Sequence, residues 1–138
     1  MSSKSKGSAA ERELVSMLWG AGLCSVRIAG SGVSRFPCPD VLASNGSKVF
    51  AIECKSCKNK KRYISAQQIR ELLEFSKAFS AEPLIAVKVA NEGWFFLSPN
   101  ELEKSKGGNY VINQTILNKR ARRFIDISRG EKQARLIE

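Results

Sequence analysis

Three residues, Asp40, Glu53 and Lys55, have the types and spacing that catalysis on a phosphodiester requires. Asp40 follows Pro39, and Glu53-Cys54-Lys55 comes after twelve intervening residues. Residues i and i+2 of a β-strand share a face, so Glu53 and Lys55 are expected to point the same way. Two carboxylates and a positioned ammonium can hold Mg²⁺ and orient a water molecule for attack. The spacing therefore indicates nuclease chemistry.

The residues between Asp40 and Glu53 predict the element that brings the two carboxylates together. Val41-Leu42-Ala43 and Val49-Phe50-Ala51-Ile52 are apolar runs on either side of the turn pair Asn45-Gly46, which is typical of a β-hairpin. A charged pair at a strand end is often only a solvated ion pair. Here the preceding strand is apolar on both faces, as in a buried strand, and such strands seldom end in Glu-x-Lys without a role for the charges.

This order of residues resembles the PD-(D/E)-x-K nuclease superfamily, and the flanking stretches narrow the resemblance to the archaeal Holliday junction resolvases. The resemblance covers residues 6–98 in consistent order, which makes it far more specific than the three-residue motif. No such resemblance is found over residues 107–138. The matching stretches are Gly7–Leu14, Val26–Gly32, Phe36–Asp40, Ala51–Lys55, Leu73–Phe79 and Pro83–Lys88.

The resemblance implies a metal-dependent, structure-selective DNA endonuclease that resolves four-way junctions by symmetric paired nicks during recombination and repair. It also implies a homodimer and a product with a 5′-phosphate. Two alternatives stay open. One is another nuclease of the superfamily, acting on other DNA structures or sequences. The other is a basic DNA-binding protein without activity, against which the intact Asp40, Glu53 and Lys55 argue.

The expected metal ligands are Asp40 and Glu53, with the backbone carbonyl of Cys54 as a further oxygen ligand. The resemblance adds Glu11 as a metal-site carboxylate, although the helix dipole alone favours a carboxylate near a helix start. Mg²⁺ is the expected cofactor, and Mn²⁺ is expected to substitute for it. Lys55 would stabilise the charge that develops on phosphorus, or would only pair with Glu53.

Other polar and basic residues are candidates for contacts with DNA. By resemblance, Arg12 contacts phosphate or the active site, although it could also be a solvated helix residue. The resemblance also implies that the Ser31 hydroxyl orients the scissile phosphate, although a serine between glycines also builds turns. Arg27 lies beside this loop and could bind a phosphate with two hydrogen bonds or pair with a carboxylate. The basic run Lys119–Arg123 is expected to follow phosphates too. The candidate DNA-binding residues are Arg12, Arg27, Ser31, Arg35, Lys58, Lys60, Lys61 and Arg62.

Composition agrees with a nucleic-acid partner. The chain has 138 residues, the size of one domain. Its 23 Lys and Arg residues against 13 Asp and Glu residues give a formal charge of +10, which favours a large polyanion as partner. No apolar run of about eighteen residues and no signal peptide are found. A soluble, cytoplasmic, DNA-associated protein is therefore expected.

The pattern of elements predicts an α/β domain with a restriction-endonuclease-like mixed central sheet flanked by helices. Ser8 is the expected N-cap of the first helix, with Glu11 completing a capping box. The expected domains are a flexible basic arm over residues 1–7, one nuclease domain over 8–127 and a tail over 128–138. The expected elements are a helix over 8–20, a strand over 24–29, the hairpin, a basic loop over 58–62, a helix over 65–80, strands over 83–89 and 94–97, and a short helix from Pro99.

Two further patterns bear on assembly and on metal binding. Phe75 and Phe79 are four residues apart in the second predicted helix, so they share one face. That face predicts a deeper core or a subunit interface, and the resemblance favours the interface of a homodimer.

Cys54-x-x-Cys57 has the spacing of zinc ligands, but the chain has no His, and free thiols are the expected state.

Overall fold

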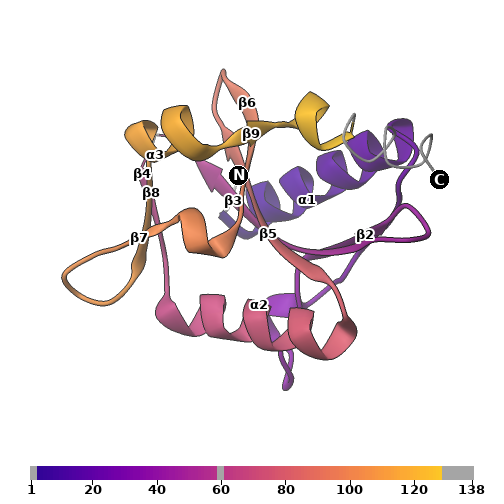
Figure 1. The fold of residues 1–138 in the computed structure, drawn as a ribbon, viewed down its shortest axis with the longest axis horizontal. Helices are drawn as coiled ribbons and strands as arrows, with labels where there is room; N and C mark the ends of the chain where they lie inside the picture. Colours follow the sequence, from indigo (N-terminus) through magenta and orange to yellow (C-terminus); the bar gives the residue numbers. More distant parts are fainter. Residues whose placement is uncertain (1–2, 59–60, 129–138) are drawn as a thin grey trace.

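The computed structural model describes residues 3–58 and 61–128, and Figure 1 shows their arrangement as helices packed around a central sheet. The predicted α/β class with a mixed sheet flanked by helices is confirmed. The helices include α1 (Ser3–Gly20), α2 (Ala66–Phe79) and α3 (Gln114–Arg120), with short 3-10 turns η1 (Ser31–Val33) and η2 (Pro99–Glu101), and residues 124–128 are also helical. The strands are β1 (Cys24–Arg27), β2 (Val41–Ser44), β3 (Val49–Cys57), β4 (Lys61–Ile64), β5 (Glu82–Val89), β6 (Gly93–Leu97), β7 (Glu103–Lys104), β8 (Tyr110–Asn113) and β9 (Arg122–Arg123).

The strands form two sheets. The central, six-stranded sheet has the order β1-β2-β3-β5-β6-β9, and a three-stranded sheet has the order β4-β8-β7. Strand β3 pairs in parallel with β5, while β1 with β2, β2 with β3, β5 with β6 and β6 with β9 are antiparallel. The parallel pair requires a crossover, which contains α2. The N-terminus of α2 follows directly after β4.

The predicted hairpin is confirmed as β2 and β3, and it places Asp40 beside the middle of β3, which continues past Glu53 and Lys55 to Cys57. Asn45 stabilises the turn, because its side-chain oxygen accepts hydrogen bonds from the backbone N–H groups of Ser47 (2.9 Å) and Lys48 (2.7 Å). Gly46 has φ of 98°, which glycine adopts without strain. The backbone N–H of Asp40 donates to the carbonyl of Ile52 at 3.0 Å. Asp40 and Glu53 are therefore held close together by backbone pairing.

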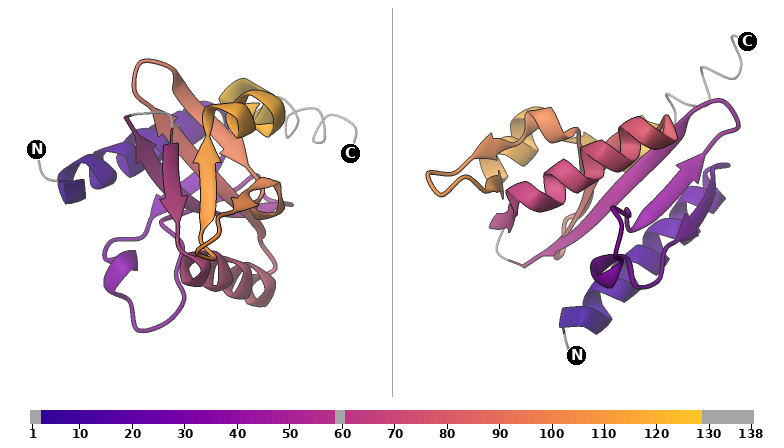
Figure 2. Two further views of the ribbon diagram at one scale, coloured as in Figure 1. Left: turned by 90° about the vertical axis from the view of Figure 1, so that its left-hand side faces the viewer. Right: turned by 90° about the horizontal axis from the view of Figure 1, so that it is seen from below.

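Two hydrophobic cores lie on opposite faces of the central sheet. On β5, Leu84 points into the core that contains Leu14 of α1. Its neighbour Ile85 points into the other core, which contains Leu72 of α2. This alternation is the normal consequence of strand geometry. Figure 2 shows α1 and α2 covering the two sides of the sheet.

The first helix starts earlier than predicted. It begins at Ser3 rather than at Ser8, so the predicted flexible arm over residues 1–7 is helical from Ser3 onward. The residues before Ser8 include no proline, and a helix once started gains one hydrogen bond for each residue added. Ser8 is consequently not the N-cap, and Glu11 is not in the first turn of α1.

The second sheet also corrects the prediction of a basic loop over residues 58–62. Lys61 and Arg62 belong to β4, which pairs with β8 in the register Lys61↔Asn113 and Ile64↔Tyr110. The strand forms because Ile64 is buried in the core of α2 together with Ile112. This partner lies almost fifty residues later in the chain, so local patterns did not predict the pairing.

Several predictions fall at the limits of the described residues. Lys60 lies outside them, as does the predicted tail except for Ser128, which is buried. The predicted helix over 65–80 is confirmed as α2, with Ser65 as its N-cap. The helix expected from Pro99 is the 3-10 turn η2. None of the helices in the described part of the chain is both long and apolar enough to cross a membrane.

Candidate active site

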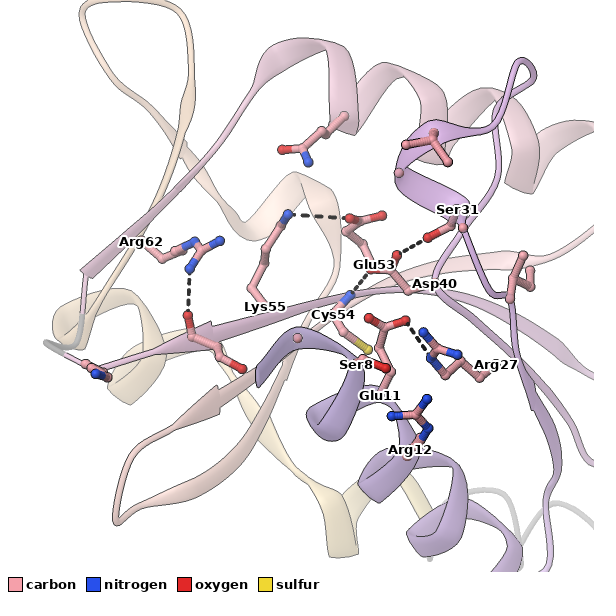
Figure 3. Close-up of a pocket in the computed structure, with 18 residues that line it drawn as sticks. Ser8, Glu11, Arg12, Arg27, Ser31, Asp40, Glu53, Cys54, Lys55 and Arg62 are labelled. Carbon is pink, nitrogen blue, oxygen red and sulfur yellow. Dashed lines mark hydrogen bonds and ion pairs between the residues drawn. The ribbon is translucent and has the colours of Figure 1, made fainter. Parts of the chain in front are cut away.

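The predicted carboxylates and several predicted cations line one cavity of about 1080 Å³. Figure 3 shows that α1, the loop after β1, the residue before β2 and the middle of β3 contribute side chains that point toward one another. Segments distant in sequence thus meet in one cavity. The predicted site residues among those that line the cavity are Glu11, Arg12, Arg27, Ser31, Asp40, Glu53, Cys54, Lys55, Lys58 and Arg62.

Both carboxylate oxygens of Asp40 are held by hydrogen bonds. The Ser31 hydroxyl donates to Asp40 Oδ1 at 2.6 Å, and the backbone N–H of Cys54 donates to Asp40 Oδ2 at 2.9 Å. These bonds fix the orientation of the carboxylate from two sides. Ser31 thus contacts the predicted metal ligand, and its contact with phosphate stays a prediction.

Glu53 is the most strongly perturbed carboxyl group of the site. Its side chain is only 14% exposed, and Lys55 Nζ lies 3.5 Å from its Oε1. Burial, followed by the negative charge of Asp40, raises the pKa of Glu53 to about 8, against the opposing effect of Lys55. The negative charge of Asp40 thus adds to burial in disfavouring the ionisation of Glu53.

The donor set fits a hard divalent cation. Carboxylate oxygens are the ligands that Mg²⁺ prefers, and a cation between Asp40 and Glu53 would relieve the repulsion that raises the Glu53 pKa. Across residues 3–58 and 61–128, no three carboxylate, thiol or imidazole side chains form a complete metal-binding group. Two protein carboxylates with the remaining positions open to water are the usual arrangement for Mg²⁺.

Glu11 lies in the same cavity, but its carboxylate pairs with Arg27. Arg27 Nε lies 3.4 Å from Glu11 Oε1, and both side chains are largely buried. Burial and the charge of Asp40 raise the pKa of Glu11, while Arg27 lowers it. The structural alternative for Arg27, an ion pair with a carboxylate, is therefore present. The metal-binding role of Glu11 stays a prediction.

The predicted DNA-binding cations divide into two groups. Arg12, Lys58 and Arg62 line the cavity, and all three are exposed. Arg62 Nη1 donates to the carbonyl of Ser56 at 2.9 Å, which directs it toward β3. Arg35 and Lys61 do not line the cavity, and each lies over an aromatic ring.

These ring contacts and the C-terminal cations lie away from the cavity. The Arg35 guanidinium lies 5.9 Å from the Phe36 ring, and Lys61 Nζ lies 5.3 Å from the Tyr63 ring. In the second predicted basic run, Arg123 donates to the carbonyl of Glu92 at 2.7 Å. The residues of that run do not line the cavity.

Sequence reasoning missed Gln68 as a site residue. It lies in the first turn of α2 and lines the main cavity and a second one of about 410 Å³. The two cavities also share Ser31, Asp40 and Glu53. A local signal was present, because Ser65 and Gln68 have capping-box spacing and so mark the start of a helix. Only the fold reveals that this helix start faces the carboxylates.

The four cysteines are thiols rather than disulfides. All four cysteines are free, as expected, and Cys57 is buried. Burial raises the pKa of the Cys54 thiol well above its ordinary value, and the nearby carboxylates add to this, so Cys54 stays a neutral thiol.

On the apolar face of α2, Phe75 and Phe79 stack with ring centroids 5.0 Å apart. Phe75 packs against the core, whereas Phe79 is 51% exposed.

Comparisons with known proteins place the chain among archaeal Holliday junction resolvases. A family model described as archaeal Holliday junction resolvase (hjc) matches residues 2–135. The chain is 42% identical over 113 residues to the crossover junction endodeoxyribonuclease Hjc of Archaeoglobus fulgidus, which covers 82% of each chain. It is also 42% identical over 100 residues to the crossover junction endodeoxyribonuclease Hje of Saccharolobus solfataricus, which covers 70% of this chain and 74% of that one.

A solved structure has the same fold. The structure of Archaeoglobus fulgidus Hjc, described as a Holliday junction resolvase from an archaeal hyperthermophile, superposes with a TM-score of 0.82 at 35% sequence identity. The superposition covers 88% of this chain and 99% of that chain. The family match also extends well past residue 98, where the resemblance noticed in the sequence ended.

Proposed function

This chain belongs to the archaeal Holliday junction resolvase family, and from that membership we propose that it is a Mg²⁺-dependent endonuclease that resolves four-way DNA junctions by symmetric paired nicks. Mn²⁺ would substitute for Mg²⁺. The observation that carries the proposal is the position of Asp40 and Glu53 at the end of one hairpin, with Lys55 Nζ 3.5 Å from Glu53. The family and this site together support hydrolysis of a DNA phosphodiester.

Asp40, Glu53 and the carbonyl of Cys54 would hold the cation, with Glu11 close by. Bound Mg²⁺ would act as a Lewis acid on the phosphoryl group and neutralise developing charge. Ser31 and the backbone N–H of Cys54 keep the Asp40 carboxylate in one orientation. Lys55, whose side chain is only 12% exposed, places an ammonium in a poorly solvated position. An ammonium in such a site stabilises negative charge on phosphorus more strongly than it would in water.

In the proposed hydrolysis, the oxygen of a water molecule bonds to phosphorus while the bond between phosphorus and the 3′ oxygen breaks. One fragment then ends in a 3′-hydroxyl and the other in a 5′-phosphate. Arg12, Lys58 and Arg62 would bind neighbouring phosphates along the cavity. The substrate would be selected by the shape of the branch point, because phosphate contacts carry no sequence information. The formal charge of +10 favours association with any DNA.

A four-way junction has two symmetry-related strands to cut, so we propose a homodimer with one site for each strand. The exposed side chains of Leu73 (44% exposed) and Phe79 (51% exposed) on α2 support this assembly. Apolar side chains this exposed on one helix are costly in water and favour a covered surface.

Incubation with an end-labelled immobile four-way junction tests the proposal. The wild-type chain is expected to produce paired, symmetric nicks with 5′-phosphate ends in Mg²⁺ or Mn²⁺, and no product in a chelator. Asp40→Asn removes a charged ligand, so cutting should fall by a factor on the order of 10³ while junction affinity is nearly kept. A duplex and a nicked flap of the same sequences are the control substrates. Normal cutting by Asp40→Asn would show that the site is elsewhere.

A further inference from the structure

We propose that Gln68 is a further substrate-contacting residue, whose side-chain amide donates a hydrogen bond to the phosphodiester at the cut. The inference rests on the proposed junction nicking and adds a residue to its site. Gln68 lies in the first turn of α2 and is partly buried. It is the residue of α2 that lines both the main cavity and the smaller cavity next to it.

The hydrogen bonds at the start of α2 determine which atom Gln68 presents to a ligand. The backbone N–H of Ser65 donates to Gln68 Oε1 at 3.2 Å, and the backbone N–H of Gln68 donates to the Ser65 hydroxyl at 3.1 Å. A backbone N–H requires an acceptor, so the oxygen of the amide must face Ser65. The Gln68 NH₂ group has no hydrogen-bond acceptor within the described part of the chain. The cap therefore leaves a donor with a defined position.

The neighbouring amide is engaged elsewhere. Gln67 Nε2 donates to Glu71 Oε1 at 3.1 Å, one helical turn further along α2. Gln67 is exposed and lines only the smaller cavity. The two adjacent glutamines thus differ in whether the side-chain NH₂ group already has an acceptor. Gln68 offers a free donor to the carboxylate site, whereas the Gln67 amide already has an acceptor.

The charges of the two cavities explain why a neutral donor is useful at this position. Arg12, Lys58 and Arg62 line the main cavity, but no described Lys or Arg lines the smaller one. Asp40 and Glu53 line both cavities. A DNA strand that passes these carboxylates meets negative charge on leaving the basic side. A further cation there would pair with Glu53, as Lys55 does, and would weaken the hold on a metal. A neutral amide donates to phosphate without this competition.

Two substitutions at Gln68 separate the donor from the helix cap. Gln68→Glu keeps an acceptor for the Ser65 N–H, since glutamate serves in a capping box as well as glutamine, but removes the NH₂ group. Gln68→Leu removes the donor without adding charge. Gln67→Glu and Gln67→Leu make the same changes at the adjacent residue and are the matched controls. All four variants are compared with wild type by thermal unfolding, by junction affinity in a chelator and by single-turnover cutting in Mg²⁺ at saturating enzyme.

Both Gln68 variants are expected to cut roughly ten- to a hundred-fold more slowly at saturation, the range for one hydrogen bond to a charged group. Junction affinity should stay close to wild type, because this is one contact among many. Both Gln67 variants should cut at the wild-type rate. Gln68→Glu should unfold at the wild-type temperature, and so it tests the donor even if Gln68→Leu is unstable.

Three results would overturn the inference. The first is wild-type cutting by either folded Gln68 variant, which would make the donor unnecessary. The second is equal slowing by Gln67→Glu and Gln68→Glu, which would show that added charge is responsible. The third is a loss of affinity with normal cutting at saturation, which would place the contact away from the cut. Failure of the wild-type chain to cut a junction would instead count against the proposed function itself.

Discussion

At the scale of single residues, burial and the neighbouring charge of Asp40 determine the protonation of Glu53. In the folded protein the pKa of Glu53 is about 8, whereas its ordinary value is 4.5, so the side chain stays protonated at neutral pH. The negative charge of Asp40, whose carboxylate accepts two hydrogen bonds, contributes to the raised pKa of Glu53. The pair is therefore costly to ionise without a cation, and a metal would be bound in competition with a proton.

This competition predicts how stability depends on pH in a chelator. Because the Glu53 pKa is raised on folding, its contribution is fully present below 4.5 and is lost as pH rises toward about 8. Glu53→Gln should remove that fall, since the amide stays neutral throughout. Urea unfolding across this pH range measures the difference between the two proteins. Glu103→Gln, at a side chain that is 60% exposed, is the control and should keep the wild-type profile. Parallel profiles for wild type and Glu53→Gln would contradict the prediction.

At the scale of elements, the pairing of β4 determines which of its basic side chains line the cavity. Lys61 and Arg62 are adjacent in sequence, and neighbouring residues of a strand point to opposite faces. Arg62 accordingly lines the cavity, whereas Lys61 lies over the Tyr63 ring. A basic run that looks uniform in the sequence is thus divided by the pairing of β4 with β8.

The division predicts unequal effects on DNA binding. Arg62→Gln should weaken binding to junction and duplex alike and reduce the log–log salt slope by about one unit, because one phosphate contact is lost. Lys61→Gln removes the same charge from the other face of the strand and should change the slope less. Titrations of labelled DNA at several salt concentrations measure both. Equal slopes for the two variants would mean that β4 does not direct these charges.

At the scale of the whole molecule, α2 keeps apolar side chains exposed that the protein's own core does not cover, Phe79 among them. Phe75 packs against the core while Phe79, stacked on it, is 51% exposed. A second subunit placed there by two-fold symmetry would cover both copies of this side chain. Each subunit would then act on its own strand of the junction, so resolution needs both sites in one complex.

Loss of this face should separate nicking chemistry from resolution. Phe79→Asp places a charge in the proposed interface, so sedimentation should show a monomer that fails to resolve junctions although Asp40 and Glu53 are intact. Ile125→Asp makes the same change at a side chain that is also 51% exposed and should leave the dimer unaffected. Mixed dimers of wild-type and Asp40→Asn subunits should nick one strand and rarely the second. A wild-type chain that is monomeric at micromolar concentration and resolves junctions would contradict this account.

The sequence by itself determined those parts of the protein that depend on local patterns. The apolar runs on either side of Asn45-Gly46 predicted the hairpin, and the hairpin accounts for the meeting of Asp40 and Glu53. Helical spacing in the same way predicted α2 and its Phe75/Phe79 face. These patterns suffice because neighbouring residues set strand alternation, turn conformation and helix faces. The resemblance to a nuclease family followed from the same stretches.

Only the tertiary structure decided what depends on residues far apart in the chain. The β4–β8 pairing, the hydrogen bond from Ser31 to Asp40 and the position of Gln68 beside Glu53 all join separate segments. The pKa of Glu53 near 8 belongs with them, because burial comes from the elements that close around the site. Local sequence carries the residues that could do the chemistry. Their protonation and their partners are set by packing, which a local pattern does not contain.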